Sequence, residues 1–540
     1  MQAQDLGRIG KKDMLTVSGG MNYNAVFYDA QGMQNRRDPF TWYFNGNIDM
    51  NFLGVDLPFT YSYTNNHGTY TQPFNMQSCH PHYKWATAHI GTTAMNFSGY
   101  TLSGRIFTGA GMELKPANWY VGAMYGRFSK ADEGDAAVSF ENAAFRRTGC
   151  AAKMGYDKNG NALSATFFSA KDDAASLAFI PPEAGISPME NTAMSVSGKI
   201  TLFRIFHVES EMALSGITKN SLSPVVTTGF SGLEKWMMTT HTTTAFFHAW
   251  KMSAGYTGKI FALSLNHERV DPDYETFGAY YFTNDLDNWT LAPSLRLWKG
   301  KLTLALNAGV QRNNLDATKI NTMHRIVSSC AISFVPSASW MMSFSFSDFT
   351  SYTNRRPLTD PFWSPSPADT LNFYQVSQQG NACVMYMFGK KEMKQNFSLS
   401  GSYQRSMQQG GAMGTDIYNG NVSYSLQLAK QKMSFSVLGN FNEAGTGAVV
   451  SEYFGPGWQG SCSLLKNTLR CSAGTVYNVS LTNGAAAKIC SYRAQLSYSP
   501  GMKNKKYGRP VLSLNAVYVQ RFASQDTGEL TVTVNAGYSF

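Results

Sequence analysis

The chain ends with Leu530-Thr-Val-Thr-Val-Asn-Ala-Gly-Tyr-Ser-Phe540, in which apolar and polar residues alternate without a break. Successive side chains of a β-strand point to opposite faces, so this stretch has one apolar face and one face of Thr, Asn, Gly and Ser. Leu15-Thr-Val-Ser-Gly-Gly-Met-Asn-Tyr-Asn-Ala-Val-Phe27, near the other end of the chain, repeats the pattern. Both stretches are therefore predicted to be strands that lie between an apolar and a polar environment.

The same alternation continues through most of the chain, and its details indicate a membrane barrel rather than a soluble sheet. The segments run for about 10–13 residues, longer than the usual globular strand and close to what a tilted strand needs to cross a bilayer. The polar face holds Ser, Thr, Asn, Gln and Gly, as expected of a water-filled lumen. Clear examples occur at residues 41–52, 289–297, 302–310, 340–347 and 397–404.

The composition excludes several other classes of protein. Charged residues make up 15% of the chain and aromatic residues 14%, whereas soluble globular proteins have about 25% charged residues. No segment approaches the roughly 18 uninterrupted apolar residues of a membrane-spanning helix. The mean hydropathy of -0.25 is mildly polar. These values suit a barrel, because its strands need only half of their residues to be apolar.

Connections between the predicted strands alternate between short and long, as in outer-membrane barrels with short periplasmic turns and long extracellular loops. Short turns are predicted at 299–301, 335–337, 429–432 and 465–468, and long loops at 65–82, 171–189, 216–239, 270–287 and 350–371. We predict an all-β fold, a single large antiparallel transmembrane β-barrel of about 24 strands, in the range of about 22–26. An even strand number places both termini on the periplasmic side.

Residues 1–13 are interpreted as a short periplasmic segment before a barrel formed by residues 14–540. The opening Met1-Gln-Ala-Gln-Asp5 fits the remnant of a signal-peptide cleavage site. The segment 94–117 breaks the rhythm of the barrel, because it is much longer than the short turn expected there. Two interpretations remain open for it, an extra hairpin or a segment that folds into the lumen.

Lys and Arg number 45 against 35 Asp and Glu, a net charge of +10. This excess fits either a basic rim facing anionic lipid headgroups or a lumen that favours anions. The basic residues predicted to face the lumen are Arg147, Lys153, Lys199, Lys251, Arg296, Arg325 and Arg493. The acidic ones are Asp49, Glu209, Glu211 and Glu268. The set predicts a bias toward anions; the alternative is that these charges pair with one another.

No motif predicts a metal site, a cofactor or catalysis. His207, Glu209 and Glu211 occupy alternate positions of one strand and could contact a divalent cation, but a polar barrel wall produces the same spacing. Cys79-His-Pro-His82 supplies at most three donor groups at the end of a loop, so loop composition explains it better. Without a catalytic constellation the chain is expected not to be an enzyme. Nucleic-acid binding is not expected either, because the barrel accounts for the positive charge.

The seven cysteines, an odd number, argue against a disulfide framework. Cys462 and Cys471 flank the predicted turn at 465–468 symmetrically, so they could lie opposite each other. A cross-strand disulfide there is one alternative in an oxidising periplasm. Free thiols are favoured, since a cysteine that faces lipid behaves as a small apolar residue.

The terminal strand, ending in Tyr538-Ser-Phe540, resembles the C-terminal insertion signal of bacterial outer-membrane proteins. The resemblance implies that Tyr538 and Phe540 are recognised by the barrel-assembly machinery. Three short segments resemble plugless, porin-like barrels of Bacteroidota: Tyr83-Lys-Trp85, Tyr100-Thr-Leu-Ser-Gly-Arg105 and Gly122-Ala-Met-Tyr-Gly-Arg127. TonB-dependent transporters have barrels of similar size but carry a plug domain before the first strand. A first strand near Leu15 is expected to leave no room for such a plug.

The leading hypothesis is a porin-like channel in the bacterial outer membrane for passive diffusion of small hydrophilic solutes, with a preference for anions. The alternative is a structural or secretion-associated barrel subunit whose lumen is occluded by a partner chain or lipoprotein, because so wide a lumen would leak unless filled. Outer-membrane lipid and, during insertion, the barrel-assembly machinery are the other expected partners.

Overall fold

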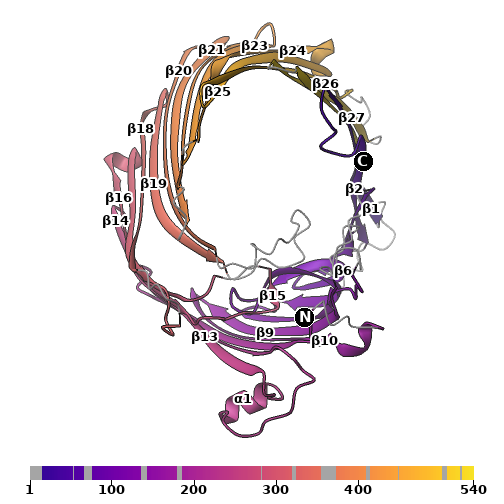
Figure 1. The fold of residues 1–540 in the computed structure, drawn as a ribbon, viewed down its shortest axis with the longest axis vertical. Coiled ribbons are helices and arrows are strands. Elements are labelled where there is room, and N and C mark those ends of the chain that lie inside the picture. Colours follow the sequence, from indigo (N-terminus) through magenta and orange to yellow (C-terminus); the bar gives the residue numbers. More distant parts are fainter. Residues whose placement is uncertain are drawn as a thin grey trace.

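A computed structural model describes residues 15–52, 54–65, 76–134, 143–178, 185–280, 283–318, 324–353, 373–408, 414–447, 449–500, 508–522 and 526–540. Most of them belong to one sheet (Figure 1). The described residues include no helix that is long and apolar enough to cross a membrane.

The first half of the sheet comprises β1 (Leu15–Gln31), β2 (Phe40–Phe52), β3 (Val55–Thr64), β4 (Met76–Cys79), β5 (His82–Tyr83), β6 (Ala86–Asn96), β7 (Leu102–Leu114), β8 (Trp119–Ser129), β9 (Arg146–Lys158), β10 (Asn161–Asp173), β11 (Glu190–Leu202), β12 (Phe206–Thr218), β13 (Thr244–Thr257) and β14 (Phe261–Val270). The second half comprises β15 (Gly278–Ala279), β16 (Leu286–Leu297), β17 (Leu302–Arg312), β18 (His324–Ser337), β19 (Trp340–Thr353), β20 (Phe373–Lys390), β21 (Met393–Gln408), β22 (Gly414–Leu428), β23 (Met433–Thr446), β24 (Val449–Leu464), β25 (Leu469–Thr482), β26 (Ala485–Tyr498), β27 (Arg509–Phe522) and β28 (Thr527–Ser539). The helical pieces are α1 (Gly232–Met237) and the single turns η3 (Ala174–Ser176), η5 (Trp298–Gly300) and η7 (Leu465–Asn467).

The sheet closes on itself as an antiparallel barrel, because β1 pairs with β2 on one side and with β28 on the other. In the described part of the chain β4 and β5 share one position in the wall, and β15 pairs with β7 from inside the barrel. The wall therefore has 26 strands, which confirms the predicted all-β barrel and falls at the upper end of the predicted range. Closure leaves no strand edge unpaired, as a membrane interior requires.

The predicted C-terminal signal lies at this closing seam. The backbone N–H of Phe540 donates to the Gly19 carbonyl at 2.9 Å, and the Gly19 N–H donates back to the Phe540 carbonyl at 2.9 Å. The rings of Tyr538 and Phe540 stack with centroids 5.9 Å apart. The terminal residue thus completes the ladder between the two ends of the chain.

The alternating sequence gives the wall two different faces. Large apolar side chains on one face are exposed, for example Leu399, Leu163 and Met212, as expected of a belt that contacts lipid tails. Residues paired directly across two strands point to the same face. The continuous register therefore extends this assignment around the barrel, with the Ser-, Thr- and Asn-rich face toward the lumen.

The predicted short turns lie at the end of the barrel that holds Leu15 and Phe540, whereas the short connections from β23 to β24 and from β25 to β26 lie at the opposite end. Turns predicted at 299–301, 429–432 and 465–468 are confirmed by η5, the connection from β22 to β23, and η7. The turn predicted at 335–337 is displaced along the chain, because β18 continues to Ser337 and the turn lies at residues 338–339. Pro336 suggested a turn, but it lies at an irregularity of the ladder between Phe334 and Ser337, where the missing N–H of proline is tolerated.

Several predicted loops differ in extent from the sequence analysis. The loops at 171–189 and 270–287 are shorter, since β10 reaches Asp173 and β16 begins at Leu286. The loop at 65–82 includes β4, and its residues 66–75 lie outside the described part. Of the loop at 350–371, β19 includes residues up to 353 and the rest lies outside the described residues. Residues 1–13 also lie outside them.

The loop predicted at 216–239 begins three residues later than expected, because β12 continues to Thr218. Residues 219–243 with α1 project outside the ring of strands (Figure 1). Phe230 packs edge-on against Phe246 of β13 at a centroid distance of 5.7 Å, and Met238 lies beside Gly216 of β12. Both strand residues belong to the outer face, so the loop covers the outside of the barrel.

The segment 94–117 contains the end of β6, the turn 97–101, the wall strand β7 and a short connection to β8. Its residues 97–101 fold into the lumen against the inner face of β9–β14, as their contacts with distant strands show below.

We predict that Leu399→Arg destabilises the barrel by about 2–4 kcal/mol, because it places a charge on the lipid-facing belt. Ser400→Arg, the neighbouring residue on the inner face, should cost much less, because its side chain enters water. Urea-unfolding titrations in lipid vesicles measure both free energies. Equal losses for the two variants would contradict the assignment of the faces.

Candidate functional site in the barrel lumen

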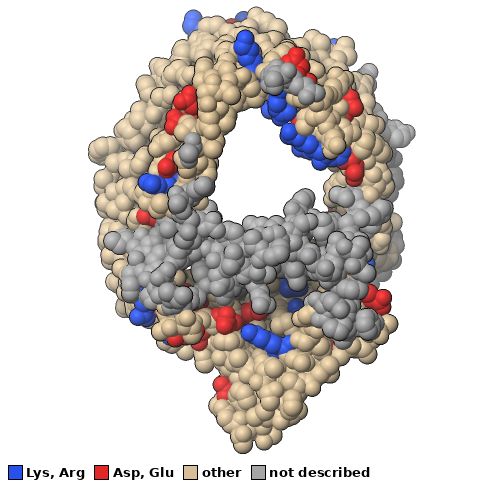
Figure 2. Space-filling model, viewed as in Figure 1, with Lys and Arg blue, Asp and Glu red and all other residues tan. Residues whose placement is uncertain are grey.

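The lumen has two unlike halves. Figure 2 shows an opening straight through the molecule, bordered on one side by the bare wall of β18–β27. On the other side two segments fold inward over β7–β14. They are the turn 97–101 and residues 271–280 after β14, and together we refer to them as the lumenal lobe.

The turn 97–101 is anchored to the inner wall by side chains from three distant strands. The Tyr100 hydroxyl donates to the Glu268 carboxylate at 2.6 Å, and the Ser98 hydroxyl donates to that of Glu211. The Lys153 ammonium donates to the Phe97 carbonyl at 2.5 Å. Burial and the neighbouring Glu268 carboxylate raise the pKa of Tyr100 well above its usual range. The phenol therefore remains a hydrogen-bond donor at physiological pH.

Residues 271–280 lie on this turn and lock it in place. The Tyr274 hydroxyl donates to the Tyr100 carbonyl at 2.7 Å, and the Thr276 hydroxyl donates to the Thr101 carbonyl at 2.7 Å. Gly278 then pairs with Leu102 in a parallel bridge. A Cβ at position 278 would lie 2.2 Å from the Thr101 carbonyl oxygen, so glycine permits this close approach of the two backbones.

An apolar core lies between the lobe and the wall. Phe107, Phe128 and Phe168 occupy inner-face positions and are each at most 1% exposed. Phe277 of the lobe packs against this cluster. The inner face otherwise consists of small polar residues, so large aromatic residues on it are a visible signal in the sequence. This signal could have predicted the lobe, but no prediction was based on it.

Two arginines are enclosed beneath the lobe. Arg147 donates two hydrogen bonds to Asp172, at 2.7 and 2.9 Å, and its guanidinium carbon lies 3.6 Å from the centroid of the Phe277 ring. Arg105, which the sequence analysis missed, is 8% exposed and lies 5.3 Å from the centroid of the Tyr280 ring. These contacts hold positive charge inside the lobe and away from the open lumen.

The other predicted charges in this half of the barrel face each other across neighbouring strands. Lys199 lies directly opposite Glu209, and Lys251 lies between Glu211 and Glu268. Opposite charges at such positions attract each other. The predicted basic residues of β9–β14 thus lie opposite charges of the other sign, and Arg147–Asp172 is the ion pair within 4 Å that they form in the described part of the chain.

The open half of the wall has a different charge pattern. Arg470, Arg493 and Arg509 are exposed on its inner face and make no ion pair within the described part of the chain. Arg521 pairs with Glu529 at 2.8 Å. Figure 2 shows Lys and Arg side chains along the rim of the opening beside β26 and β27. The sequence analysis identified Arg493 and missed the others.

The remaining predicted residues have varied surroundings. Arg296 is exposed on the inner face of β16, and Asp49 accepts a hydrogen bond of 2.5 Å from Asn47. Only the backbone of Arg325 is described, opposite Gln311. The ring of His207 lies over Gly255.

The cysteine-containing patterns do not gather into a ligand set. His80 and His89 lie 2.9 Å apart through their Nδ1 atoms, and His82 contacts the Thr87 hydroxyl at 2.8 Å. Among the described residues no group of three His, Cys, Asp or Glu side chains could hold a metal ion. Cys462 lies directly opposite Cys471, as the turn symmetry predicted, and both are free thiols.

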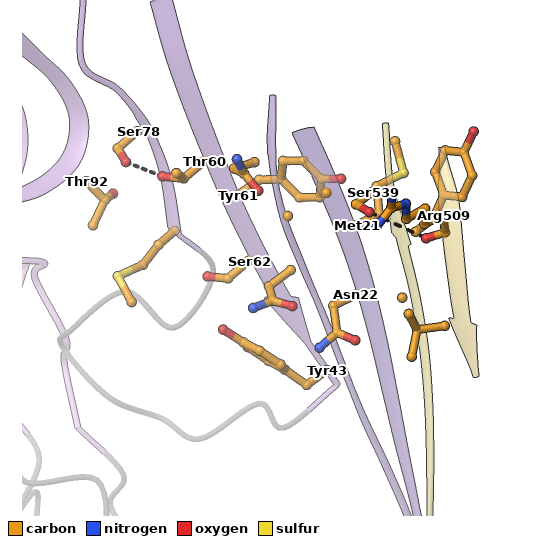
Figure 3. Close-up of a pocket in the computed structure, with 18 residues that line it drawn as sticks. Met21, Asn22, Tyr43, Thr60, Tyr61, Ser62, Ser78, Thr92, Arg509 and Ser539 are labelled. Carbon is orange, nitrogen blue, oxygen red and sulfur yellow. Dashed lines mark hydrogen bonds between the residues drawn. The ribbon is translucent and has the colours of Figure 1, made fainter. Parts of the chain in front are cut away.

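A hollow of about 610 Å³ lies on the inner wall at the seam of the barrel. Two successive rows of inner-face residues, each crossing β27, β28, β1, β2, β3 and β4, form it. One row is Arg509, Ser539, Gly20, Asn47, Thr60 and Ser78; the other is Val511, Gly537, Asn22, Asn45, Ser62 and Met76. Figure 3 shows Asn22, Tyr43 and Ser62 of this hollow, from β1, β2 and β3. Side chains from both ends of the chain thus share one site.

No protein-family model matches the sequence, and no curated protein matches it. Solved barrels resemble it weakly. The translocation pore of the P pilus usher PapC is 10% identical over 96% of this chain and 98% of its own, with a TM-score of 0.35. The outer membrane protein OprD from Pseudomonas aeruginosa is 12% identical over 79% of this chain and 93% of its own, with a TM-score of 0.33. Similarity at these sequence identities and TM-scores gives no information about the activity of this protein.

We predict that Asp172→Ala loosens the lobe by about 3 kcal/mol, because it leaves the enclosed Arg147 guanidinium without its carboxylate. Backbone amides of residues 271–280 should then exchange hydrogen roughly a hundredfold faster. Asp173→Ala is the matched control, since its partner Arg146 is half exposed and solvent-exposed ion pairs contribute little to stability. Unchanged exchange in Asp172→Ala would show that this ion pair does not hold the lobe.

Proposed function

We propose that this chain is a bacterial outer-membrane channel through which small hydrophilic solutes diffuse, with a preference for anions. The proposal rests on Arg470, Arg493 and Arg509, which are exposed on the open half of the lumen and make no ion pair with any described residue. Rings or rows of cationic side chains favour anions in a pore. The predicted basic residues of β9–β14 face opposite charges. These three arginines therefore set the sign of the electrostatic potential in the open half of the lumen.

The arginines are spaced along the direction of transport. Arg470 lies opposite Ser497, and Arg493 lies four residues farther along the same strand as Ser497. At about 3.4 Å per residue this is a step of roughly 13 Å. Arg521, paired with Glu529, lies four residues beyond Val517, the partner of Arg493. An anion that enters the open half would therefore meet successive guanidinium groups on three neighbouring strands.

We expect planar bilayers containing the protein to conduct, with a reversal potential in a KCl gradient that shows chloride to be favoured. The double variant Arg470→Gln with Arg493→Gln should shift the reversal potential toward cation preference, because it removes two lumenal charges. Lys299→Gln, in the turn η5, removes a charge outside the wall and is the control. The absence of conductance would refute an open channel, and an unchanged reversal potential in the double variant would refute the role of these arginines.

A second proposal is a structural or secretion-associated subunit that binds a partner protein. It rests on the loop 219–243, where Leu222, Val225, Leu233 and Trp236 are each more than half exposed outside the barrel. Contiguous exposed apolar surface of this kind commonly marks an interaction site.

Purification in a mild detergent followed by mass spectrometry tests this second proposal. The proposal would be supported if a stable partner copurified with the unmodified protein but not with the double variant Leu233→Ser, Trp236→Ser. This variant removes the apolar surface of the loop and leaves the barrel wall unchanged. Leu163→Ser, on the lipid-facing belt, is the control. Recovery of the barrel alone, or only with copies of itself, would refute it.

A further inference from the structure

We propose that the hollow at the closing seam binds a small sugar acid, a solute with several hydroxyl groups and one carboxylate or phosphate. The inference deepens the proposed channel function by naming its solute class, and it rests on that function for the route by which the solute arrives. Binding itself is measurable without transport.

The floor of the hollow is formed by two glycines, Gly20 and Gly537, in adjacent rows of the inner wall. A Cβ at Gly20 would have Asn47 Oδ1 at 3.5 Å as its nearest contact, and one at Gly537 would have Asn22 Oδ1 at 3.7 Å. Both are ordinary contacts, so the wall does not require glycine there. The missing side chains instead leave space over the strands, and the hollow of about 610 Å³ lies there.

The walls of the hollow carry hydrogen-bonding groups that the protein itself leaves unsatisfied. The Ser62 hydroxyl belongs to a residue that is 8% exposed, and it has no hydrogen-bond partner among the described residues. The Asn45 side-chain carbonyl is buried and also has none. An unpaired buried polar atom is costly, so both atoms favour a ligand that brings donors of its own. Hydroxyl groups can donate to Asn45 and either donate to or accept from Ser62.

Around these two atoms the lining suits a polyol. Amides of Asn22 and Asn47 and the paired hydroxyls of Thr60 and Ser78, 2.6 Å apart, surround the floor. Tyr43, 41% exposed, adds an aromatic face at the edge. Such a mixture of fixed polar groups and an aromatic surface orients a small ligand.

Charge then decides between a neutral sugar and a sugar acid. Arg509 is the charged lining residue of the hollow in the described part of the chain, and no acidic residue lines it there. Its guanidinium can bind a carboxylate or phosphate bidentately. An inorganic anion held by Arg509 would leave the Asn45 carbonyl and the Ser62 hydroxyl without a partner. The combination therefore points to an anion that also carries hydroxyls.

The test is calorimetric titration of the purified barrel in detergent with three probes: glucuronate, glucose and inorganic phosphate. We expect glucuronate to bind at least about tenfold more tightly than either of the others, a difference of roughly 1.4 kcal/mol. If glucose bound as tightly as glucuronate, the proposal that the ligand carries an acidic group would be overturned. If inorganic phosphate bound as tightly as glucuronate, the hollow would be a simple anion site, and the proposal that it recognises the hydroxyl groups of a sugar would be overturned.

Two variants with matched controls locate the site. Arg509→Gln should lower glucuronate affinity to the level of glucose, whereas Lys466→Gln, in the turn η7 outside the hollow, should leave it unchanged. Gly537→Val should abolish binding by filling the floor, and β-branched residues suit a strand. Ser436→Val, on the inner face of β23 and outside the hollow, is its control. Retained binding in Gly537→Val, with the barrel shown to be folded by its heat-dependent gel mobility, would refute the site.

A glucuronate block of single-channel current separates this inference from the channel proposal. Binding without conductance would refute the channel while leaving the site in place. Conductance without binding would refute the site while leaving the channel.

Discussion

Every feature of this molecule depends on one constraint, that backbone N–H and C=O groups in the hydrocarbon of a membrane must be paired within the protein. A sheet satisfies this constraint when it closes. Here closure requires 12 residue pairs between β1 and β28, from Gly20 opposite Ser539 to Gln31 opposite Gly528, and the final residue adds its own bonds to Gly19. The lipid-facing belt, the inner face and the alternation of the sequence all follow from that closed ladder.

Within the closed wall, the lumenal lobe divides the interior into a filled half and an open half. The filled half resembles a soluble protein, with a core of aromatic side chains and an enclosed arginine–carboxylate pair. The open half has polar, mostly uncharged side chains and a few exposed arginines. A count of lumenal charges therefore describes the pore poorly, because what matters is which charges are compensated and which face the open lumen.

The sequence was sufficient for those features that depend on neighbouring residues. Period-two alternation predicted the strands, their faces and most short turns, and the symmetry of Cys462 and Cys471 about one turn predicted their cross-strand register. It failed where contacts are distant in the chain. Tyr100 reaches Glu268 and Tyr274, and no local pattern around Tyr100 encodes those partners. The inner-face phenylalanines were a visible local signal, but their meaning depends on a segment about 170 residues away.

The hollow at the seam has a consequence for assembly. Its residues come from the first four and the last two strands, so the two parts of the hollow are separated by almost the entire chain. A polypeptide that has not yet joined its last strands to its first would have neither a sealed wall nor this hollow. The hollow could therefore recognise a solute only once the barrel is complete. An unfinished barrel could let solutes leak through but could not distinguish between them.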